Sequence, residues 1–486
     1  MLLLMMICLA GSPPSALAQW NPLGDRLQPR VAVQATAATD DGLPFWLVSN
    51  QYGRFSRDAT NAVTQLGVTI APDPSRTFDV SAGLDVAARA SANAALYAHE
   101  WYGRLHVGPF RATLGRMEHI QGIVDTSLTM GSTTWSPNAT PIPAIRVGAP
   151  SYVDVPFTRG FLAVKGAFAH GWLEQDRFVE SPYLHEKQLY ARVLPRRWPV
   201  QLHGGVIHNV VWAGTHPSLG ELADGFDTFR KVVFVEELEG DEGLPGEGED
   251  SGLGNTVAAY DFAVSAQGWG WSGRVYREFY IDTAAGRRFR NVWDGLWGVN
   301  VVRDAPGGWI DRVLFEHLRF VRQNAVKGAE GRRGARGREI YYNNFLYRTG
   351  WTYAGRVRGT PVALTDADAP QLANAEDNLP VTNNIIVANH LGIAGHPVPR
   401  WRYRVLATYS RNHGMFFNPK PRLDQFAALV EVHGDVLPEY HLGATAALAT
   451  DLGAVFDDRI GLRLGLVWTP THASGRAQRN RKINER

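Results

Sequence analysis

Apolar and polar residues alternate with a period of two over long stretches of this chain. Between Phe78 and Ala90 every even position is apolar, while the odd positions include Asp79, Ser81, Asp85 and Arg89. Alternate side chains of an extended strand point to opposite faces, so one face is apolar and the other polar. The stretch exceeds the 5–6 residues of a usual strand. It meets the ~9–11 residues that a tilted membrane-spanning strand requires.

The same alternation returns at 403–410 and 459–468, and in shorter form at 260–266, 426–432 and 440–448. The 50 Gly and 28 Pro are scattered between these stretches as turn residues, and helical periodicity is scarce. The pattern predicts an all-β protein, a large antiparallel transmembrane β-barrel with aromatic residues near both membrane interfaces. Alternation alone leaves open a soluble β-sandwich, whose outer faces are also polar.

The N-terminal residues indicate export. Leu2 to Ala10 form an apolar run, and Ala16-Leu17-Ala18 places small residues where a signal peptidase cleaves, with Gln19 as the expected mature start. No Lys or Arg precedes the run, which departs from the usual signal. The only cysteine, Cys8, lies inside it, so the mature chain lacks disulfides and thiolate ligands. No later stretch approaches the ~20 apolar residues of a membrane-spanning helix, so membrane insertion requires a closed barrel.

Charge and motifs exclude several classes of function. The formal net charge of +2 provides no field for nucleic acid. The chain has no zinc-protease, nucleophile-elbow, P-loop or dinucleotide motif, and its histidines lack metal-ligand spacing. Two Gly-rich loops, one acidic at 240–255 and one basic at 330–339, are interpreted as solvated, although the acidic one could hold calcium. We expect neither a cofactor nor a bound metal.

Carboxylates near aromatic residues give the one indication of catalysis. Glu278, Asp282 and Asp294 could form the acid pair of a glycosidase. In a barrel, such acids more often pair with interior arginines, for which Arg274, Arg277 and Arg290 are the candidates. The favoured interpretation is therefore that the protein is not an enzyme.

Three segments mix aromatic rings with planar polar groups, the combination that binds sugars: rings stack on C–H faces while amides, carboxylates and guanidinium groups take the hydroxyls. The same residues could instead be interface aromatics and turn residues. The polysaccharide-binding residues predicted from these segments are Trp293, Asp294, Trp297, Tyr342, Asn343, Asn344, Arg348, Arg411, Asn412 and His413.

These segments, and others along the chain, resemble one known family, the capsule-assembly Wzi proteins. The stretches that carry the resemblance follow one another from the N-terminal part to the C-terminal part, at 43–47, 50–54, 183–187, 208–214, 276–278, 290–298, 343–351 and 409–414. The resemblance implies a monomeric outer-membrane barrel of about 18 strands, with a small helical element near the N-terminus. It also implies a lectin-like, non-enzymatic role in organising capsular polysaccharide at the cell surface.

The resulting domain organisation has four parts. We expect a signal peptide at 1–18, an N-terminal segment with the first strand and short helices at 19–76, the barrel with its extracellular loops at 77–470, and a basic tail at 471–486. The expected partners are capsular polysaccharide and outer-membrane lipid, with no nucleic acid. A passive porin on the same architecture and an exported glycoside hydrolase are the alternative functions.

Overall fold

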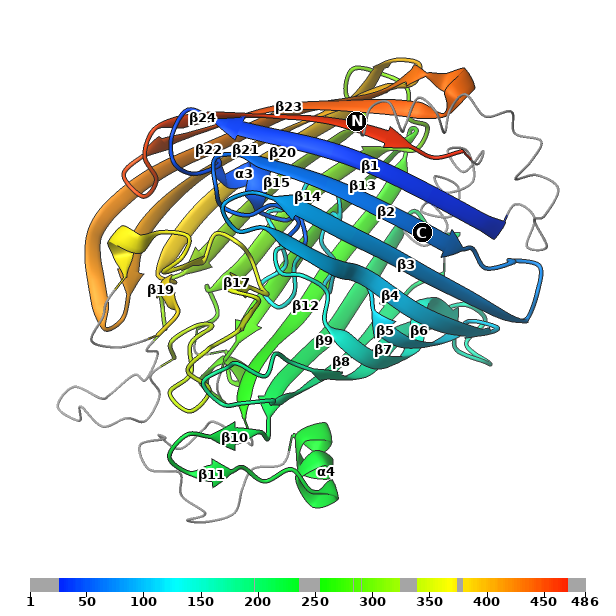
Figure 1. The fold of residues 1–486 in the computed structure, drawn as a ribbon. Coiled ribbons are helices and arrows are strands. Elements are labelled where there is room, and N and C mark those ends of the chain that lie inside the picture. Colours follow the sequence, from blue (N-terminus) through cyan, green and yellow to red (C-terminus); the bar gives the residue numbers. More distant parts are fainter. Residues whose placement is uncertain are drawn as a thin grey trace.

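The protein is a closed, tilted β-barrel (Figure 1). The computed structural model describes residues 26–195, 197–235, 254–282, 284–289, 291–323, 339–373 and 379–470. The expected signal peptide, the basic tail and most of both Gly-rich loops lie outside these residues. The 18 wall strands are β1 (Leu27–Ala38), β2 (Asn61–Ile70), β3 (Phe78–Ala90), β4 (Ala95–Val107), β5 (Phe110–Arg116), β6 (Pro143–Asp154), β7 (Leu162–Trp172), β8 (Tyr183–Val193), β9 (Val200–Trp212), β12 (Asn255–Gly268), β13 (Trp271–Ile281), β14 (Gly295–Arg303), β15 (Arg312–Phe320), β20 (Ile386–Val398), β21 (Trp401–Met415), β22 (Asn418–Leu437), β23 (Leu442–Gly453) and β24 (Arg459–Trp468).

Every wall strand is antiparallel to both of its neighbours, and the seam is closed by β1 and β24. Val31 lies opposite Trp468 and Ala38 opposite Gly461 across that seam, while β1 also pairs with β2. Closure leaves no free sheet edge. The predicted all-β barrel of about 18 strands is confirmed. β1 and β2 fall within the 19–76 segment, and both are strands of the wall.

The two ends of the barrel differ. Connections at one end, which we call the short-turn end, comprise 71–77, 108–109, 155–161, 194–199, 269–270, 304–311, 399–400 and 438–441. The other end, the long-loop end, carries 39–60, 117–142, 213–254 and 321–385. In bacterial outer-membrane barrels the short turns are periplasmic and the long loops are extracellular.

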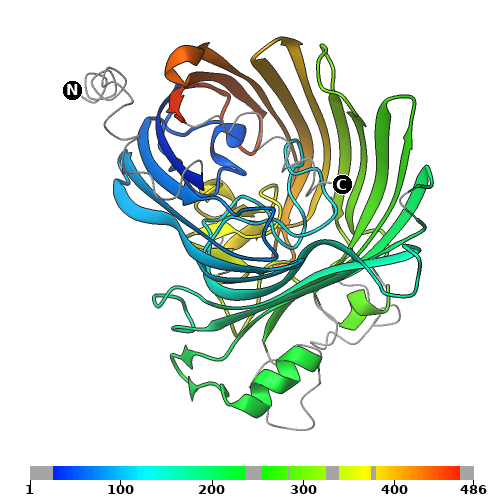
Figure 2. The ribbon, with the colours of Figure 1, turned by 90° about the vertical axis from the view of Figure 1, so that its right-hand side faces the viewer.

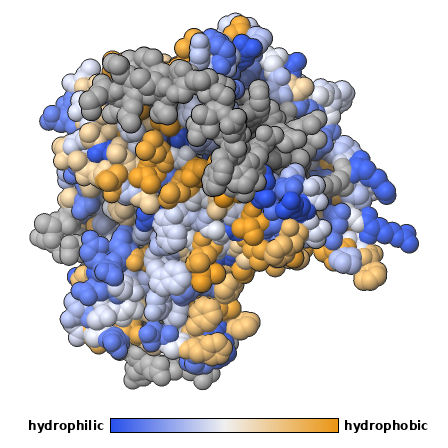
Figure 3. Space-filling model, turned by 45° about the vertical axis from the view of Figure 1, so that its right-hand side comes forward, coloured by the Kyte–Doolittle hydropathy of each residue, from blue (hydrophilic) through white to orange (hydrophobic). Residues whose placement is uncertain are grey.

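The outer surface of the wall is apolar. Phe78, Val80 and Leu84 of β3 are 64%, 53% and 45% exposed, as the alternation predicts. Their counterparts on other strands include Leu66, Leu114, Ile145, Leu189, Val264, Val275, Val299, Leu391, Val430, Leu448, Leu462 and Leu464. Figure 3 shows such side chains gathered on the outside of the wall. Exposed apolar surface of this extent is the face that a membrane barrel presents to lipid.

Most of the remaining elements lie in the long-loop connections. Inside the barrel are helix α3 (Phe45–Val48) and the short ladders β16 (Thr352–Tyr353) with β17 (Arg356–Val357) and β18 (Leu364–Thr365) with β19 (Val381–Asn383). Outside it lie β10 (Thr215–His216), β11 (Gly220–Glu221) and helix α4 (Phe226–Phe234), as Figure 2 shows. The elements are completed by α5 (Ala284–Arg287), η2 (Pro370–Leu372) and η3 (Pro438–Tyr440). Within the described residues, helices of membrane-spanning length and apolarity are absent.

Candidate functional site

Three segments from the long-loop end fold back into the barrel. They are 39–60, 117–142 and the described parts of 321–385, seen inside the ring of strands in Figure 2. Trp46, Leu128, Tyr342 and Trp351, one or more from each segment, are at most 2% exposed. The three segments together are called the plug below. The open lumen that a passive porin needs is therefore occupied by packed side chains.

Wall carboxylates hold segment 117–142 in place. Glu316 on β15 accepts hydrogen bonds from the Thr129 hydroxyl at 2.7 Å and the Met130 amide at 2.8 Å. Glu278 on β13 accepts from the Ser132 hydroxyl at 2.9 Å and the Thr133 hydroxyl at 2.6 Å. Because these carboxylates are at most 1% exposed, the plug donors supply the hydrogen bonds that water would otherwise provide.

A third carboxylate repeats the arrangement on β12. Asp261 accepts a hydrogen bond from the Ile123 amide at 2.7 Å and one from the Tyr190 hydroxyl at 3.0 Å. Asp261, Glu278 and Glu316 all lie on the inward faces of their strands, where the alternation places polar side chains. Together they form a line of acceptors against which one irregular segment is fixed.

The tip of segment 117–142 reaches the short-turn end. Asp125 lies 2.8 Å from Arg312, the first residue of β15, and accepts a 2.8 Å hydrogen bond from the Asn300 amide. Burial alone would raise the pKa of Asp125, but the Arg312 charge and the hydrogen bonds from Ser127 outweigh it and leave the pKa below its usual value. The plug therefore spans the length of the barrel and is anchored at its far end by an ion pair.

Segment 339–373 packs on top of segment 117–142. The Trp351 indole donates to the Thr134 carbonyl at 2.9 Å, and the Tyr342 hydroxyl donates to the Thr133 carbonyl. Arg358 is fully buried, with its guanidinium 3.4 Å from the centroid of the Trp351 ring and 5.5 Å from that of Trp135. Its guanidinium nitrogens have no hydrogen-bond partner among the described residues, and burial lowers its pKa well below the usual value.

The N-terminal helical element expected from the resemblance is α3, which lies inside the barrel. The Phe45 amide donates to Asp451 on β23 at 2.9 Å, and the Trp46 indole donates to Thr408 on β21 at 3.2 Å. All four residues of α3 are buried. Local propensity cannot hold so short a helix, so its contacts with the wall do.

The ten predicted polysaccharide-binding residues occupy different environments. Trp293 and Trp297 are 60% and 39% exposed, and Trp297 lies on the outward face of β14, between strands of lipid-facing apolar side chains. Arg348 is exposed at the long-loop end, whereas Asn344, Arg411 and His413 are half-buried. Asp294, Tyr342, Asn343 and Asn412 are at most 2% exposed.

Asn343, Asn412 and His413 of this set are brought together through segment 381–385. The Asn343 amide donates to the Val381 carbonyl at 2.8 Å, and the Asn383 amide donates to Asn412 at 2.8 Å. The His413 amide donates to the Ile385 carbonyl at 2.9 Å. The aromatic-polar segments around Asn343 and Asn412 are thus joined by a buried amide network, which holds the plug to β21.

Of the arginines predicted to pair with the carboxylates, Arg290 lies outside the described residues, and the prediction is wrong for Arg277. Asp294 pairs with Arg319 and accepts hydrogen bonds from the amides of Val321 and Arg322, and burial raises its pKa. Arg277 points outward and donates to the carbonyl oxygens of Glu278, Val292, Asp294 and Leu296. The strand pattern places Arg277 and Glu278 on opposite faces, so they cannot share one interior site.

A cluster at the long-loop end, called the mouth patch here, consists of the exposed Phe345 and Arg348, the half-buried Phe178 and the buried His216. The Arg348 guanidinium lies 5.1 Å above the Phe178 ring, and the His216 ring meets the same Phe178 edge to face at 5.2 Å. The Phe178 amide donates to the Thr349 hydroxyl at 2.9 Å. Phe345 is 43% exposed and packs against Phe417 at 5.5 Å.

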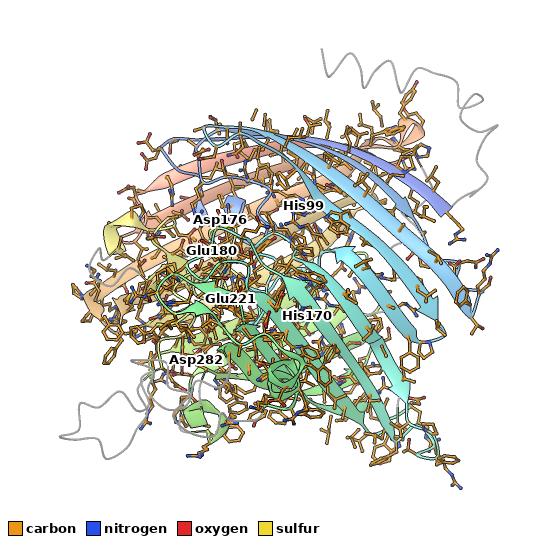
Figure 4. All side chains as sticks on the ribbon, turned by 60° about the horizontal axis from the view of Figure 1, so that its bottom comes forward. His99, His170, Asp176, Glu180, Glu221 and Asp282 are labelled. Atoms are coloured by element: carbon orange, nitrogen blue, oxygen red, sulfur yellow. The ribbon has the colours of Figure 1, made fainter. Side chains whose placement is uncertain are left out.

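Exposed carboxylates flank the mouth patch. Glu180 and Glu221 lie on either side of Thr215, which bridges to Glu180 and pairs with Glu221, and Asp176 lies on the same loop as Glu180; Figure 4 labels all three. All three side chains are exposed. No group of three or more His, Cys, Asp or Glu residues in the described part of the chain has an arrangement that could hold a metal ion.

Sequence reasoning missed segment 117–142, its wall carboxylates Asp261 and Glu316, and Phe178. One signal was present: between Arg116 and Pro143 the chain loses its alternation and becomes rich in Ser, Thr, Gly and Pro. A stretch so long without alternation is unusual for a surface loop in a compact protein and indicates a functional or packed segment.

Comparisons with known proteins now bear on this architecture. The family described as capsule assembly protein Wzi matches residues 27–373. A solved structure of Wzi from Escherichia coli, described as an outer membrane protein involved in group 1 capsule assembly and a carbohydrate-binding β-barrel, aligns with a TM-score of 0.56 at 13% identity, over 90% of this chain and 83% of that one.

Two other solved barrels align less well. OccK9 (OpdG) of Pseudomonas aeruginosa gives a TM-score of 0.45 at 10% identity, covering 93% of this chain and 100% of its own. OccAB4 of Acinetobacter baumannii gives 0.44 at 7% identity, covering 92% and 99%. None of the curated proteins matches this chain.

The family match covers most of the chain and includes the plug segments 39–60 and 117–142, the wall from β1 to β15 and the mouth patch. The closed barrel with an apolar outer surface is the architecture of an outer-membrane protein. This chain is therefore an outer-membrane β-barrel that belongs to the capsule assembly protein Wzi family.

Proposed function

We propose that this protein binds capsular polysaccharide at its long-loop end and organises it at the cell surface without catalysing a reaction. Three observations support the proposal: the family, the carbohydrate-binding description of the Escherichia coli structure, and the position of the mouth patch. The observation that carries it is Arg348, exposed at the outer end of a plugged barrel and held over the Phe178 ring. A barrel with a filled interior offers a polymer its outer surface rather than a passage.

The chemistry of the mouth patch suits an acidic or neutral sugar. The exposed Phe345 ring, with the half-buried Phe178 ring beneath Arg348, is a flat apolar surface against which the C–H groups of a pyranose can stack. The Arg348 guanidinium offers planar donors to a carboxylate or to paired hydroxyls. Of the ten predicted binding residues, Arg348 and its neighbour Asn344 are the ones that we assign to this surface.

Absence of catalysis is part of the proposal. A glycosidase needs two carboxyl groups that reach the scissile bond. Glu278 and Asp294 are each 1% exposed, and their oxygens accept hydrogen bonds from plug, loop and wall donors. These carboxylates hold structure, and a sugar at the mouth patch would not reach them.

We further propose that the protein acts as a monomer in contact with outer-membrane lipid. The seam between β1 and β24 uses all strand edges within one chain, so a second copy is not needed to complete the sheet. The apolar outer face needs lipid around its whole circumference.

Binding to purified capsular polysaccharide tests the proposal. We expect Arg348→Ala to weaken binding by the detergent-solubilised protein about tenfold, equivalent to ~1.4 kcal/mol. Phe178→Leu, which keeps apolar packing and removes the ring, should weaken it severalfold. Arg76→Ala is the matched control, because Arg76 is an exposed arginine whose side chain is 61% accessible at the short-turn end.

The same variants should be tested in cells that produce capsule. Arg348→Ala should release polysaccharide into the medium, while Arg76→Ala should retain it on the surface. Wild-type protein that does not bind the polysaccharide would refute the proposed function. Undiminished binding by Arg348→Ala and Phe178→Leu would refute the assignment of the mouth patch.

A further inference from the structure

Helix α4 packs against the outside of the barrel wall, as Figure 2 shows. Its Phe229 ring lies 5.8 Å from Trp212 on β9, 5.9 Å from His185 on β8 and 6.4 Å from Phe168 on β7. These three wall residues point outward, because Trp172, Leu189 and Val206, each an even number of residues from one of them on the same strand, are exposed on the outer surface.

A lysine in the wall fixes the C-terminal end of α4. Lys187 on β8 donates to the carbonyl oxygen of Val232 at 3.2 Å and to that of Val233. The last carbonyls of a helix lack partners within the helix and carry partial negative charge, so a cation satisfies them. A charge on the lipid face of a barrel is costly, and this contact gives Lys187 polar partners at that position.

The helix also covers other polar groups of the outward face. His185 is fully buried beneath α4 although it belongs to the lipid-facing set of β8. His170, opposite His185 in the ladder, lies 5.9 Å from Phe229. His208 lies opposite Lys187 on β9. The wall beneath α4 is therefore a polar island in an apolar surface, and the helix separates part of it from lipid.

The exposed side of α4 carries bulky apolar residues beside charged ones. Phe226, Phe234 and Val235 are 82%, 69% and 41% exposed. The basic residues Arg230 and Lys231 both pair with Asp227 along the helix, at 3.1 Å each. Arg230 is four residues from both Phe226 and Phe234, so it lies on the same side of the helix as these rings. Exposed aromatic rings beside basic residues, whose apolar stems lie along the rings while their charges reach the headgroups, suit a helix at a membrane interface.

The position of α4 along the wall strands indicates what contacts Phe226 and Phe234. Its wall partners lie in the half of β7, β8 and β9 nearest the long-loop end, where Trp172, Tyr183 and Trp212 place aromatic rings typical of a membrane interface. Helix α4, and with it Phe226 and Phe234, therefore lies beside the lipid-facing surface of the same strands. We propose that α4 is an interfacial helix whose Phe226 and Phe234 insert into the lipid leaflet at the long-loop end.

Site-directed labelling tests this directly, because Cys8 is the only cysteine in the sequence. In a Cys8→Ser background, Phe226→Cys and Phe234→Cys would each carry a bimane label in phosphatidylcholine vesicles with or without doxyl-labelled lipid. Leu189→Cys on the lipid-facing wall and Leu219→Cys on the β10–β11 turn, 59% and 41% exposed, are the controls. We expect severalfold quenching at 226, 234 and 189, and little at 219.

Two outcomes would overturn the proposal. Labels at 226 and 234 that remain as bright as the label at 219 would place α4 in water. Energy transfer between labelled chains, with no lipid quenching, would instead place a second copy on the helix. Quenching at 189 shows in the same sample that the barrel has inserted.

A second variant isolates the role of the wall lysine. Lys187→Met removes the donor at the C-terminal end of α4 while keeping a long side chain. We expect it to reduce quenching at 234 at least twofold and to leave quenching at 189 unchanged. Equal quenching at 234 with and without Lys187 would show that the lysine does not hold the helix at the membrane.

Discussion

The carboxylate of Asp125 lies 2.8 Å from the guanidinium of Arg312, although 187 residues separate them. Asp125 belongs to a connection from the long-loop end, and Arg312 begins a strand at the short-turn end. Their contact shows that the plug extends through the whole barrel. Removal or protonation of the Asp125 carboxylate should therefore release the far end of the plug.

Removing this anchor should loosen the plug tip. Asp125→Ala leaves the charge of Arg312 without its 2.8 Å partner and deletes acceptors for Ser127, Leu128 and Asn300, a loss of about 3 kcal/mol. In planar bilayers we expect the wild-type protein to pass no steady current and Asp125→Ala to show brief openings. The exposed Asp304→Ala, on the 304–311 turn, is the control. An equally silent Asp125→Ala would rule out an anchoring role.

The same anchor predicts a response to acid. The pKa of Asp125 is below the ordinary value of 3.8, because Arg312 and the Ser127 hydrogen bonds outweigh burial. Its stabilising contribution is therefore complete above pH 3.8 and is lost as the pH falls through the lowered value. Wild-type openings should emerge only in that acidic range, whereas the openings of Asp125→Ala should not increase there by this route. Wild-type openings that begin near neutral pH would contradict this assignment.

Trp351 should be a main contributor to plug stability. It is fully buried, donates to the Thr134 carbonyl and supports the Arg358 guanidinium on its ring. Trp351→Ala should lower the free energy of unfolding by about 3–5 kcal/mol, measured by urea denaturation in detergent. Trp293→Ala, at a position 60% exposed, should change it by about 0.5 kcal/mol or less. Similar losses for the two variants would show that Trp351 is not part of a packed core.

Lipid contact predicts a depth dependence for charge on the wall. Leu448, midway along β23 and 54% exposed, faces the centre of the membrane. Leu448→Arg should make folding into vesicles less favourable by about 2–4 kcal/mol. Val436→Arg, near the short-turn end of β22 and 39% exposed in the wild type, should cost about 0–1 kcal/mol. Equal costs at both depths would argue against a membrane around this wall.

The wall could be predicted from the sequence because its determinant is local. Alternation between Phe78 and Ala90 directly specifies which side chains of β3 face lipid, and the exposed fractions follow it. The same holds for β24, where Ile460, Leu462 and Leu464 are about half exposed. Periodicity does not predict the number of strands, which only the resemblance to the Wzi family implies.

The interior could not be predicted, because its determinants are distant in sequence. Glu278 is satisfied by Ser132 and Thr133, 146 and 145 residues away, and no local pattern pairs them. Asp294 forms its ion pair with Arg319 rather than with Arg277, although Arg277 is nearer in sequence. The Arg277 side chain points outward from β13, so its charge is not available inside the barrel. Aromatic-polar composition identified segments that meet, but it could not separate the buried Asn343 from the exposed Arg348.

The seam between the first and last strands has a consequence for biogenesis. Segment 117–142 is hydrogen-bonded to β12, β13, β15 and β20, so it must already lie inside when β24 meets β1, or be threaded into a finished cylinder afterwards. Threading would require the Glu278 and Glu316 partners to enter through a mouth that segment 339–373 also occupies. We therefore expect the plug to fold first and the wall to close around it, so that the pairing of β1 with β24 is the final step of assembly.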